Sequence, residues 1–391
     1  CQLPHRGAEE LCVFAQDFIK PQVPTATPQS ALTGCQLPFQ GRFGGETKRN
    51  SIQLGGKNMK QYTVAVLGAT GAVGQEMMKI LAERDFPVGT LVPLASARSA
   101  GKTVKFKGQD VTIREAADDA FAGVDIVLGA AENDIAKRFA PAIVRAGAVF
   151  VDNSSAFRLQ DDVPLVVPEI NPQDVKNHHG IISNPNCSTI ITVTAVNALN
   201  AIAPIRAMTA STYQAVSGAG AGGPIELMNE VEALAKGEHY EPKVFSHQIA
   251  YNLIPQIGGE QFEGYTSEEM KMQNEGRKIM HLPGLKVSCT CVRVPVVRSH
   301  SISVSLRFDR PVTVEQARQV IAKAPGCKLV DDLANKQYPM PLDTSDQDIV
   351  FVGRIRPDLT DPNGLCLWCC GDQVRKGAAT NAIQIAELLV K

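Results

Sequence analysis

Cys187 is the residue whose surroundings point most directly to chemistry. It follows two asparagines and a proline in SNPNCST and precedes the apolar run IITVTAVNAL. Asn184 and Asn186 are good N-terminal caps, and Pro185 disfavours an earlier start, so a helix is predicted to begin at the cysteine. Unpaired backbone N–H groups and the positive end of the helix dipole favour a thiolate there. The stretch predicts a cysteine nucleophile; an inert buried cysteine is the alternative.

A second chemical signal is a glycine turn. Gly68, Gly71 and Gly74 recur at three-residue spacing between a short apolar strand around Val64 and an amphipathic helix around Ile80. Such a turn lets the backbone approach a pyrophosphate, whose charge then faces the helix N-terminus. The order strand, glycine turn, helix predicts a dinucleotide-binding unit.

The end of the next strand indicates which dinucleotide binds. Residues 91–94 are apolar and run into Ser96, Arg98 and Ser99, with no acid at the strand end. NAD-binding units place an acid there to hold the ribose 2′-hydroxyl, whereas a cation and hydroxyls suit a 2′-phosphate. The pattern predicts NADP; an exposed basic loop is the alternative.

Three further positions carry weaker signals. Arg158 follows the predicted strand Ala148–Val151 in the zone where parallel sheets collect ligands, so it is a candidate anion-binding residue. His300 is in phase with the apolar residues of an alternating strand and should point inward, as many ordinary core histidines do. Glu268 and Lys271 stand at i and i+3, a spacing that is typical of a helix-stabilising ion pair.

The elements that must position these residues alternate along the chain. Short apolar strands separated by helices predict an α/β fold with a Rossmann-type doubly wound parallel sheet over residues 60–186. Alternating strands beyond residue 187 predict a second, α+β domain with a mixed or antiparallel sheet over residues 187–371. The C-terminal segment 372–391 is predicted to form a helix that packs back on the first domain and completes it.

Local predictions accompany this organisation. Ser267 is a plausible cap for the helix that carries Glu268. Residues 164–171 are interpreted as connecting surface. Cys289 and Cys291 lie in one predicted strand, and three more cysteines cluster at 366–370, but both segments look buried, so no metal site is assigned.

Composition sets the outer bounds. The chain has 391 residues, 44% of them apolar, a net charge of −1 and ten cysteines. These values favour a cytoplasmic protein with reduced thiols and give no support for a nucleic-acid or membrane partner. Residues 1–58 have little periodicity, lack the apolar run of a secretory signal and contain several acids, unlike transit peptides. They are predicted to be a disordered leader or sequence foreign to the fold, and Met59 resembles a natural start.

The motifs taken in order resemble one family. GATGAVG, ASARSAGK, DNSSAFR, NPNCST, QAVSGAGAGG, EEMK, RVPVVRSHS and RKGAATNAIQ are similar to segments of aspartate-β-semialdehyde dehydrogenase in its bacterial forms. The resemblance covers essentially Tyr62 to Lys391. N-acetyl-glutamyl-phosphate reductase shares the architecture, but EEMK and RVPVVRSHS fit it less well.

The resemblance implies roles for residues of the second domain. Cys187 would be the nucleophile, His300 the general acid/base, and Gln214 the residue that orients the acyl intermediate. Arg293 would bind the substrate α-carboxylate and Glu268 its amino group. The phosphate-binding positions implied are Arg158, Lys271 and Asn186.

The resemblance also implies the nucleotide contacts and the reaction. Beside the glycines, Ser96 and Arg98, the NADP contacts implied are Thr70, Gly71, Ala72, Val73, Ser99, Ser217, Gly218 and Gln373; the family often has asparagine at the last position. The expected activity is NADPH-dependent reductive dephosphorylation of L-aspartyl 4-phosphate through a cysteine thioester, in lysine, threonine and methionine (diaminopimelate) biosynthesis. A homodimer formed through the second domain is implied. A related acyl-phosphate reductase and a non-catalytic NADP-binding regulator are the alternative functions.

Overall fold

The first sheet is parallel throughout and carries the glycine turn. The structure, a computed structural model, describes residues 60–390; the predicted leader lies outside the described residues. The strand order of this sheet is β5 (Arg114–Glu115), β2 (Val88–Ala95), β1 (Tyr62–Leu67), β6 (Ile126–Gly129), β7 (Val149–Asp152) and β8 (Ile181–Ser183). A hairpin of β3 (Thr103–Phe106) and β4 (Gln109–Thr112) stands beside it.

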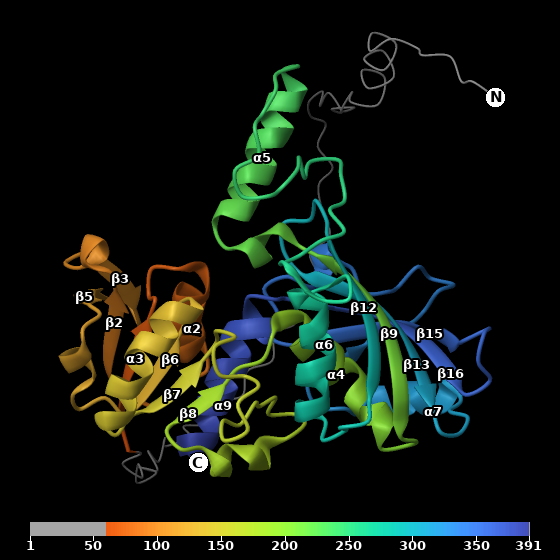
Figure 1. Cartoon of the computed structure of the whole chain (residues 1–391), viewed down its shortest axis with the longest axis horizontal. Coiled ribbons are helices and arrows are strands. Elements are labelled where there is room, and N and C mark those ends of the chain that lie inside the picture. The colour runs from red at the N-terminus through yellow and green to blue at the C-terminus, as the bar shows by residue number, and fades with distance from the viewer. Residues whose placement is uncertain (1–59, 391) are drawn as a thin grey trace, which may run out of the picture. The chain divides into compact units, whose positions relative to one another are not determined.

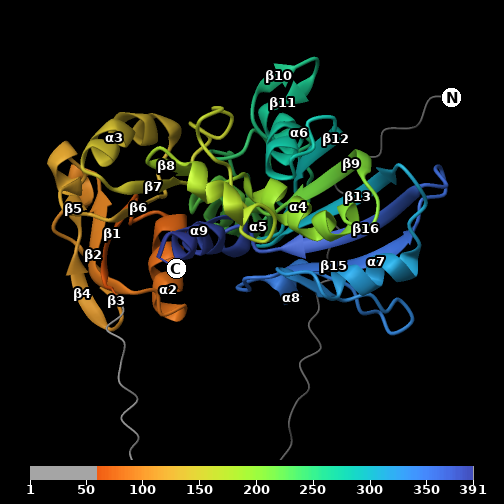
Figure 2. The same cartoon turned by 90° about the horizontal axis from the view of Figure 1, so that it is seen from below.

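Helices cover both faces of this sheet, as the run of apolar strands requires. On one face Val64 and Val66 pack with α2 (Ala72–Glu83) and with the C-terminal helix α9 (Thr380–Val390). On the other face Ala65 and Leu67 pack with α3 (Asn133–Arg145). Figure 2 shows α9 beside α2, which it contacts. The predicted return of the tail to the first sheet is therefore seen, with a π-turn at Arg375–Ala379 before α9 begins.

The second sheet is mixed. Its order is β12 (Lys286–Arg293), β9 (Ile205–Gln214), β13 (His300–Phe308), β16 (Gly364–Gly371), β15 (Val350–Pro357) and β14 (Cys327–Leu329). β12 runs parallel to β9, whereas β13 is antiparallel to both β9 and β16. Figure 1 shows the two sheets, with α4 (Cys187–Asn200) and α6 (Ser267–Ile279) against the mixed one. The predicted α/β fold class is confirmed.

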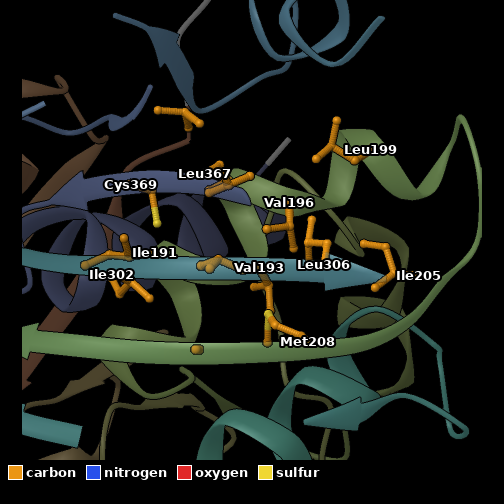
Figure 3. Packing of buried hydrophobic residues seen from close by; sticks show 14 of the residues in the cluster. Ile191, Val193, Val196, Leu199, Ile205, Met208, Ile302, Leu306, Leu367 and Cys369 are labelled. Carbon is orange, nitrogen blue, oxygen red and sulfur yellow. The ribbon is translucent and has the colours of Figure 1, made fainter. Parts of the chain in front are cut away.

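The mixed sheet and α4 share one core. Apolar residues of α4, including Ile191, Val193 and Val196, meet Ile302 and Leu306 of β13 (Figure 3). The cluster extends to α7 (Val314–Ile321) through Ala317 and Ile321. Because all these groups are buried, α4 is fixed along its length, and so is its first residue, Cys187.

The remaining elements stand at the rim. They are α5 (Gly222–Ala235), the hairpin of β10 (Glu260–Phe262) and β11 (Tyr265–Thr266), α8 (Pro341–Thr344) and four 3₁₀ turns (Ala97–Ser99, Asp118–Phe121, Pro172–Asn177 and Val216–Ala219). No helix within residues 60–390 is long and apolar enough to cross a membrane.

Two local predictions were wrong. The cap of α6 is Thr266, not Ser267, because the Thr266 hydroxyl and the Glu269 carboxylate form a reciprocal capping box. Residues 164–171 are not connecting surface. Val166, Val167 and Asn171 are buried there, because Leu165 forms a parallel bridge to Ser183 that extends the sheet edge.

Candidate active site

The start of α4 has the predicted form. Asn186 is the N-cap, and its side-chain oxygen accepts a hydrogen bond from the Thr189 N–H at 3.2 Å. Cys187 is the first helical residue. The π-turn passes close behind it, since a Cβ on Gly377 would lie 3.0 Å from the Cys187 Cβ. The cysteine is thereby held between a capped helix start and a glycine that leaves it room.

The register of the mixed sheet brings three strand ends to the cysteine. Gln214 ends β9 and Arg293 ends β12, and the two are paired in the parallel register. His300 begins β13, which runs antiparallel to β9 and pairs Ser301 with Tyr213, so His300 falls beside Gln214. Residues that lie far apart in the sequence therefore share one sheet edge because the strand order places β12, β9 and β13 together.

The imidazole of His300 faces the thiol. Its Nε2 lies 3.5 Å from the Cys187 Sγ, and the ring is fully buried. The Ala215 N–H donates to Nδ1 at 3.1 Å, so the neutral ring carries its proton on Nε2, on the side of the sulfur. A Cβ on Gly218 would come within 3.1 Å of the His300 Cε1 and 2.9 Å of the Arg293 Nη1, so a larger residue there would have to displace both side chains.

The predicted thiolate is not the resting state of this pocket. Burial, together with the nearby Glu268, raises the pKa of Cys187 to about 11. Burial, with Arg293 nearby, lowers the pKa of His300 to about 3. The prediction considered only the helix start, whereas removal from water disfavours the charged form of both groups. With these pKa values the two groups are a neutral thiol and a neutral imidazole near pH 7.

Glu268 is the centre of the charge network. Its carboxylate accepts from Lys271 Nζ at 2.9 Å, from Asn186 Nδ2 at 2.9 Å and from Gln214 Nε2 at 3.3 Å. Burial alone would raise its pKa, but Lys271 and these hydrogen bonds outweigh burial and bring the pKa of Glu268 to about 2. The predicted i, i+3 ion pair is therefore present, and its carboxylate is an anion inside the site.

Two arginines approach the same space from different elements. Arg293 is 7% exposed and donates from Nη1 to the Ala215 carbonyl at 2.7 Å. Arg158 is also 7% exposed, so it is not an ordinary solvated loop arginine. Its Nε donates to the Asn184 carbonyl at 3.0 Å, next to the cap of α4. Both cations lie close enough to lower the pKa of Cys187, although less than burial raises it.

The glycine turn has the geometry that a close backbone approach requires. Gly68 has φ +91°, and a Cβ on it would lie 2.6 Å from the Ala130 carbonyl oxygen. A Cβ on Gly74 would collide with the Gly68 carbonyl. Gly71 is the N-cap of α2, so Ala72 and Val73 are its first residues. The turn fits a dinucleotide pyrophosphate at the start of α2.

A cavity of about 300 Å³ lies beyond the carboxyl ends of β1 and β2. Gly68, Thr70 and Ser96 line it, together with Glu115 and Arg138. Neither of the last two was predicted, because they come from β5 and α3 and not from the segment after β2. Arg98 and Ser99 follow in a 3₁₀ turn at Ala97–Ser99, and Arg98 is exposed.

The other predicted nucleotide residues meet nearer the cysteine. The Gln373 amide donates to the Ser217 hydroxyl, and its oxygen accepts from the Ser299 N–H at 2.9 Å. Ser217 in turn donates to the Val297 carbonyl at 2.6 Å. A cavity of about 490 Å³ is lined by Ala72 as well as Ser217, so the glycine turn and the loop beside His300 open onto one space.

The thiols remote from this site form no metal centre. Within residues 60–390 no three His, Cys, Asp or Glu side chains are arranged to hold a metal ion. The Cys289 and Cys291 sulfurs lie 3.8 Å apart and are buried in the core.

Comparison with known proteins identifies the two halves. The family description "Semialdehyde dehydrogenase, NAD binding domain" matches residues 63–178, and "Semialdehyde dehydrogenase, dimerisation domain" matches residues 196–376. The fold and the site thus define a two-domain, dinucleotide-binding oxidoreductase with a cysteine at a helix start.

Relatives narrow this class. The chain is 50% identical to aspartate-semialdehyde dehydrogenase of Synechocystis sp. over 84% of this chain and 97% of the relative. It is 48% identical to the aspartate-semialdehyde dehydrogenase of Bacillus subtilis, over 84% of this chain and 97% of that relative. The protein belongs to the aspartate-semialdehyde dehydrogenase family, which confirms the resemblance.

Solved structures of the same family resemble this protein over most of its length. Aspartate semialdehyde dehydrogenase II complexed with ASA, from Vibrio cholerae, superposes with a TM-score of 0.83 at 42% identity, covering 85% of this chain and 98% of that one. Aspartate semialdehyde dehydrogenase with NADP, from Candida albicans, superposes with a TM-score of 0.65 at 27% identity, covering 84% of this chain and 98% of that one.

Proposed function

We propose that this protein reduces L-aspartyl 4-phosphate to L-aspartate 4-semialdehyde with NADPH, releasing phosphate through a thioester on Cys187. One observation carries the proposal: the Cys187 Sγ lies 3.5 Å from the His300 Nε2, at a site with buried carboxylates and buried arginines. A nucleophile and a proton carrier at this distance suit acyl transfer.

The charges of the pocket match an amino acid. Arg293 supplies a buried cation for an α-carboxylate, and Glu268, whose pKa is about 2, supplies an anion for an ammonium group. An N-acetylated substrate has no charge on its nitrogen and would leave Glu268 without that partner. The anionic state of Glu268 therefore favours aspartyl phosphate over acetylglutamyl phosphate.

The first half of the reaction forms the thioester. Sγ forms a bond to the acyl carbon as the carbon–oxygen bond to phosphate breaks, and phosphate leaves with the bonding electron pair. The neutral ring first moves its proton from Nε2 to Nδ1 by exchange with solvent, which breaks the hydrogen bond from Ala215. The free Nε2 then accepts the thiol proton and passes it to the departing phosphate. Arg158, Lys271 and Asn186 would hold the phosphate, since cations and amide N–H groups stabilise its charge.

The second half reduces the thioester. Bound NADPH supplies the hydride that adds to the carbonyl carbon. The resulting hemithioacetal oxygen takes a proton that the His300 Nε2 has gained from solvent, which leaves Nε2 free again. The carbon–sulfur bond then breaks, the hydroxyl proton returns to the sulfur through His300, and the aldehyde leaves. Gln214, which lies 3.4 Å from the His300 Nε2, is placed to orient the acyl group in both halves.

NADP rather than NAD is part of the proposal. Supporting it are Arg98, Ser96 and Ser99 beyond β2, together with the Candida albicans relative whose structure contains NADP. The nucleotide would lie along the glycine turn toward Ser217, Gly218 and Gln373. Glu115 lines the cavity beyond β1 and β2, and this acid would instead favour a free 2′-hydroxyl, as in NAD.

The remaining proposals concern assembly and context. We propose an NADP-binding domain of residues 60–186 completed by 372–391, and a catalytic and dimerisation domain of residues 187–371. A homodimer is supported by the dimerisation-domain match and by exposed apolar residues on α5, where Ile225 is 61% and Met228 59% exposed. The proposed setting is the cytoplasmic biosynthesis of lysine, threonine and methionine, including diaminopimelate.

The reaction is tested in reverse, where the substrates are stable. The full chain with L-aspartate semialdehyde, phosphate and NADP should form NADPH, and omission of phosphate should abolish that formation. Cys187→Ala is expected to remove at least 10⁴-fold of the rate, because no thioester can form. Cys327→Ala, at a buried thiol remote from His300, is the matched control. Undiminished NADPH formation in Cys187→Ala would exclude the mechanism.

A further inference from the structure

Glu275 is a buried acid that the proposed reaction does not use. It lies in the second half of α6 and is 1% exposed. A carboxylate at this depth has to be compensated by charge or hydrogen bonds. The identity of its partners therefore indicates what it does.

Both partners of Glu275 belong to the proposed phosphate-binding set. One carboxylate oxygen accepts from the Arg158 Nη1 at 3.0 Å, and both side chains are nearly inaccessible to solvent. The other oxygen accepts from the backbone N–H of Asn186 at 2.6 Å. Asn186 directly precedes Cys187. A single carboxylate thus joins the loop after β7, the start of the nucleophile helix and α6.

The donors of Arg158 leave room for a ligand. Its Nε donates to the Asn184 carbonyl, its Nη2 donates to the Asn153 carbonyl at 2.8 Å, and its Nη1 donates to Glu275. A guanidinium has five N–H donors, so two have no acceptor among residues 60–390, one on each terminal nitrogen. Three acceptors from three segments set the plane of the group, and the two remaining hydrogens are available for a phosphate oxygen.

The helix α6 combines this function with substrate binding. Glu268 and Glu275 stand two turns apart and so face the same side. Lys278, near the end of the helix, donates to the carbonyls of Arg158, Gln160 and Val163 at 3.0, 2.6 and 2.7 Å. Glu275 and Lys278 thus both connect α6 with the segment that carries Arg158, but Glu275 contacts the guanidinium whereas Lys278 contacts the backbone.

We propose that Glu275 is a positioning residue for phosphate: it acts through the Arg158 guanidinium and the Asn186 N–H without touching the substrate. The proposal rests on the proposed function, in which Arg158 binds phosphate. A glutamine at this position has one oxygen for two donors and presents an N–H₂ group to one of them. Either Arg158 or Asn186 then loses its acceptor, and Arg158 also loses its counter-charge.

The test measures the KM for each substrate of the phosphate-dependent reaction. Glu275→Gln is expected to raise the phosphate KM about tenfold or more, the effect of losing one charge-assisted hydrogen bond. The KM values for the semialdehyde and NADP are expected to stay within about twofold. Glu269→Gln is the matched control, since Glu269 is a buried acid of the same helix that binds only backbone N–H groups, at Thr266 and Cys291. It should leave the phosphate KM unchanged.

Several outcomes would overturn the role. An unchanged phosphate KM in Glu275→Gln would do so, and so would an equal rise in Glu269→Gln, which would indicate general loosening of α6. In an Arg158→Gln background, adding Glu275→Gln should raise the phosphate KM by less than it does in the unaltered protein, because the route through the guanidinium is gone and only that through the Asn186 N–H remains. A further tenfold rise there would contradict the proposal.

Two further cases are distinguished: a Glu275→Gln variant that does not fold, and an unaltered protein that lacks the proposed activity. If Glu275→Gln does not fold, Glu275→Asp keeps the charge but withdraws it by one methylene; it should raise the phosphate KM, and an unchanged value would overturn the role. No phosphate-dependent NADPH formation by the unaltered protein would overturn the proposed function and this inference together. Normal turnover with an unmoved phosphate KM in the variants would overturn the inference alone.

Discussion

The proposed substrate pocket and the proposed nucleotide cavity are built on different principles. In the pocket two ion pairs lie within the chain: Glu268 pairs with Lys271, and Arg158 pairs with Glu275. The third cation, Arg293, donates to the Ala215 carbonyl. In the nucleotide cavity the main feature is backbone, namely the turn from Gly68 to the start of α2, and Arg98 is exposed and makes no ion pair with any residue from 60 to 390.

The difference follows from how much water each region retains. A buried charge without a partner is costly, so the pocket for a zwitterion has to be organised before the substrate arrives. An exposed arginine remains solvated and needs no partner. Substitutions in the pocket should therefore have large and coupled effects, and those at the nucleotide cavity smaller and separable ones.

Among substitutions that leave Cys187 in place, the largest effect is expected from Glu268→Gln. It leaves Lys271 and Arg293 without their buried counter-charge, and kcat/KM for the semialdehyde should fall about 10²- to 10³-fold. Because Glu268 raises the pKa of Cys187, its removal should lower that pKa, and alkylation of the thiol by iodoacetamide at pH 8 should become faster. Turnover and thiol reactivity would move in opposite directions.

Glu269→Gln, at the next position of the same helix, is the control and should change neither quantity. Slower alkylation together with slower turnover in Glu268→Gln would indicate a distorted pocket. The contrast between a pre-compensated pocket and an open nucleotide cavity would then lose its basis.

A smaller and more selective effect is expected from Arg98→Ala. If the guanidinium binds the 2′-phosphate, the KM for NADP should rise about tenfold while that for NAD changes little. Steady-state kinetics with both nucleotides measures this, and Lys102→Ala, an exposed cation in the same loop, should change neither KM. Equal effects on the two nucleotides would instead point to the unpredicted cavity residues Arg138 and Glu115 as the source of selectivity.

The smallest effect concerns stability and pH. The pKa of His300 is about 3 in the folded protein and about 6.5 when unfolded, so between these values only the unfolded chain binds the proton. The neutral His300 therefore contributes to the free energy of unfolding in full above pH 6.5, and this contribution is lost as the pH falls toward 3. From pH 7 to pH 5 the unaltered protein should lose about 2 kcal/mol more unfolding free energy than His300→Asn. Urea unfolding at one fixed protein concentration measures the unfolding free energy at each pH. Equal losses of unfolding free energy in the two proteins would contradict a buried neutral imidazole.

Much of the nucleotide-binding region could be predicted from the sequence because its signals are local. The glycine spacing, the apolar strand before it and the amphipathic helix after it lie within one continuous stretch, and the structure shows the turn at Gly68 and the start of α2 where that stretch predicts them. The start of α4 was predicted for the same reason, from Asn186 and Pro185 next to Cys187.

The parts that escaped prediction depend on neighbours distant in the sequence. Glu115 and Arg138 reach the nucleotide cavity from β5 and α3, and Glu275 meets Arg158 across more than a hundred residues. A helical spacing of two turns from Glu268 was the available signal for Glu275, but spacing alone does not distinguish a buried face from an exposed one. The roles of Arg293 and Gln214 came from family resemblance, and the strand register then explained why the two lie together.

The sequence by itself determined where α2 and α4 begin, which turn can approach a phosphate and which cysteine stands at a helix start, because those properties depend on adjacent residues. Only the tertiary structure decided the ionisation of the site. Cys187 rests as a thiol and Glu268 as an anion because burial and partners from α4, α6, β9 and β12 act on them together, and no single segment contains that sum.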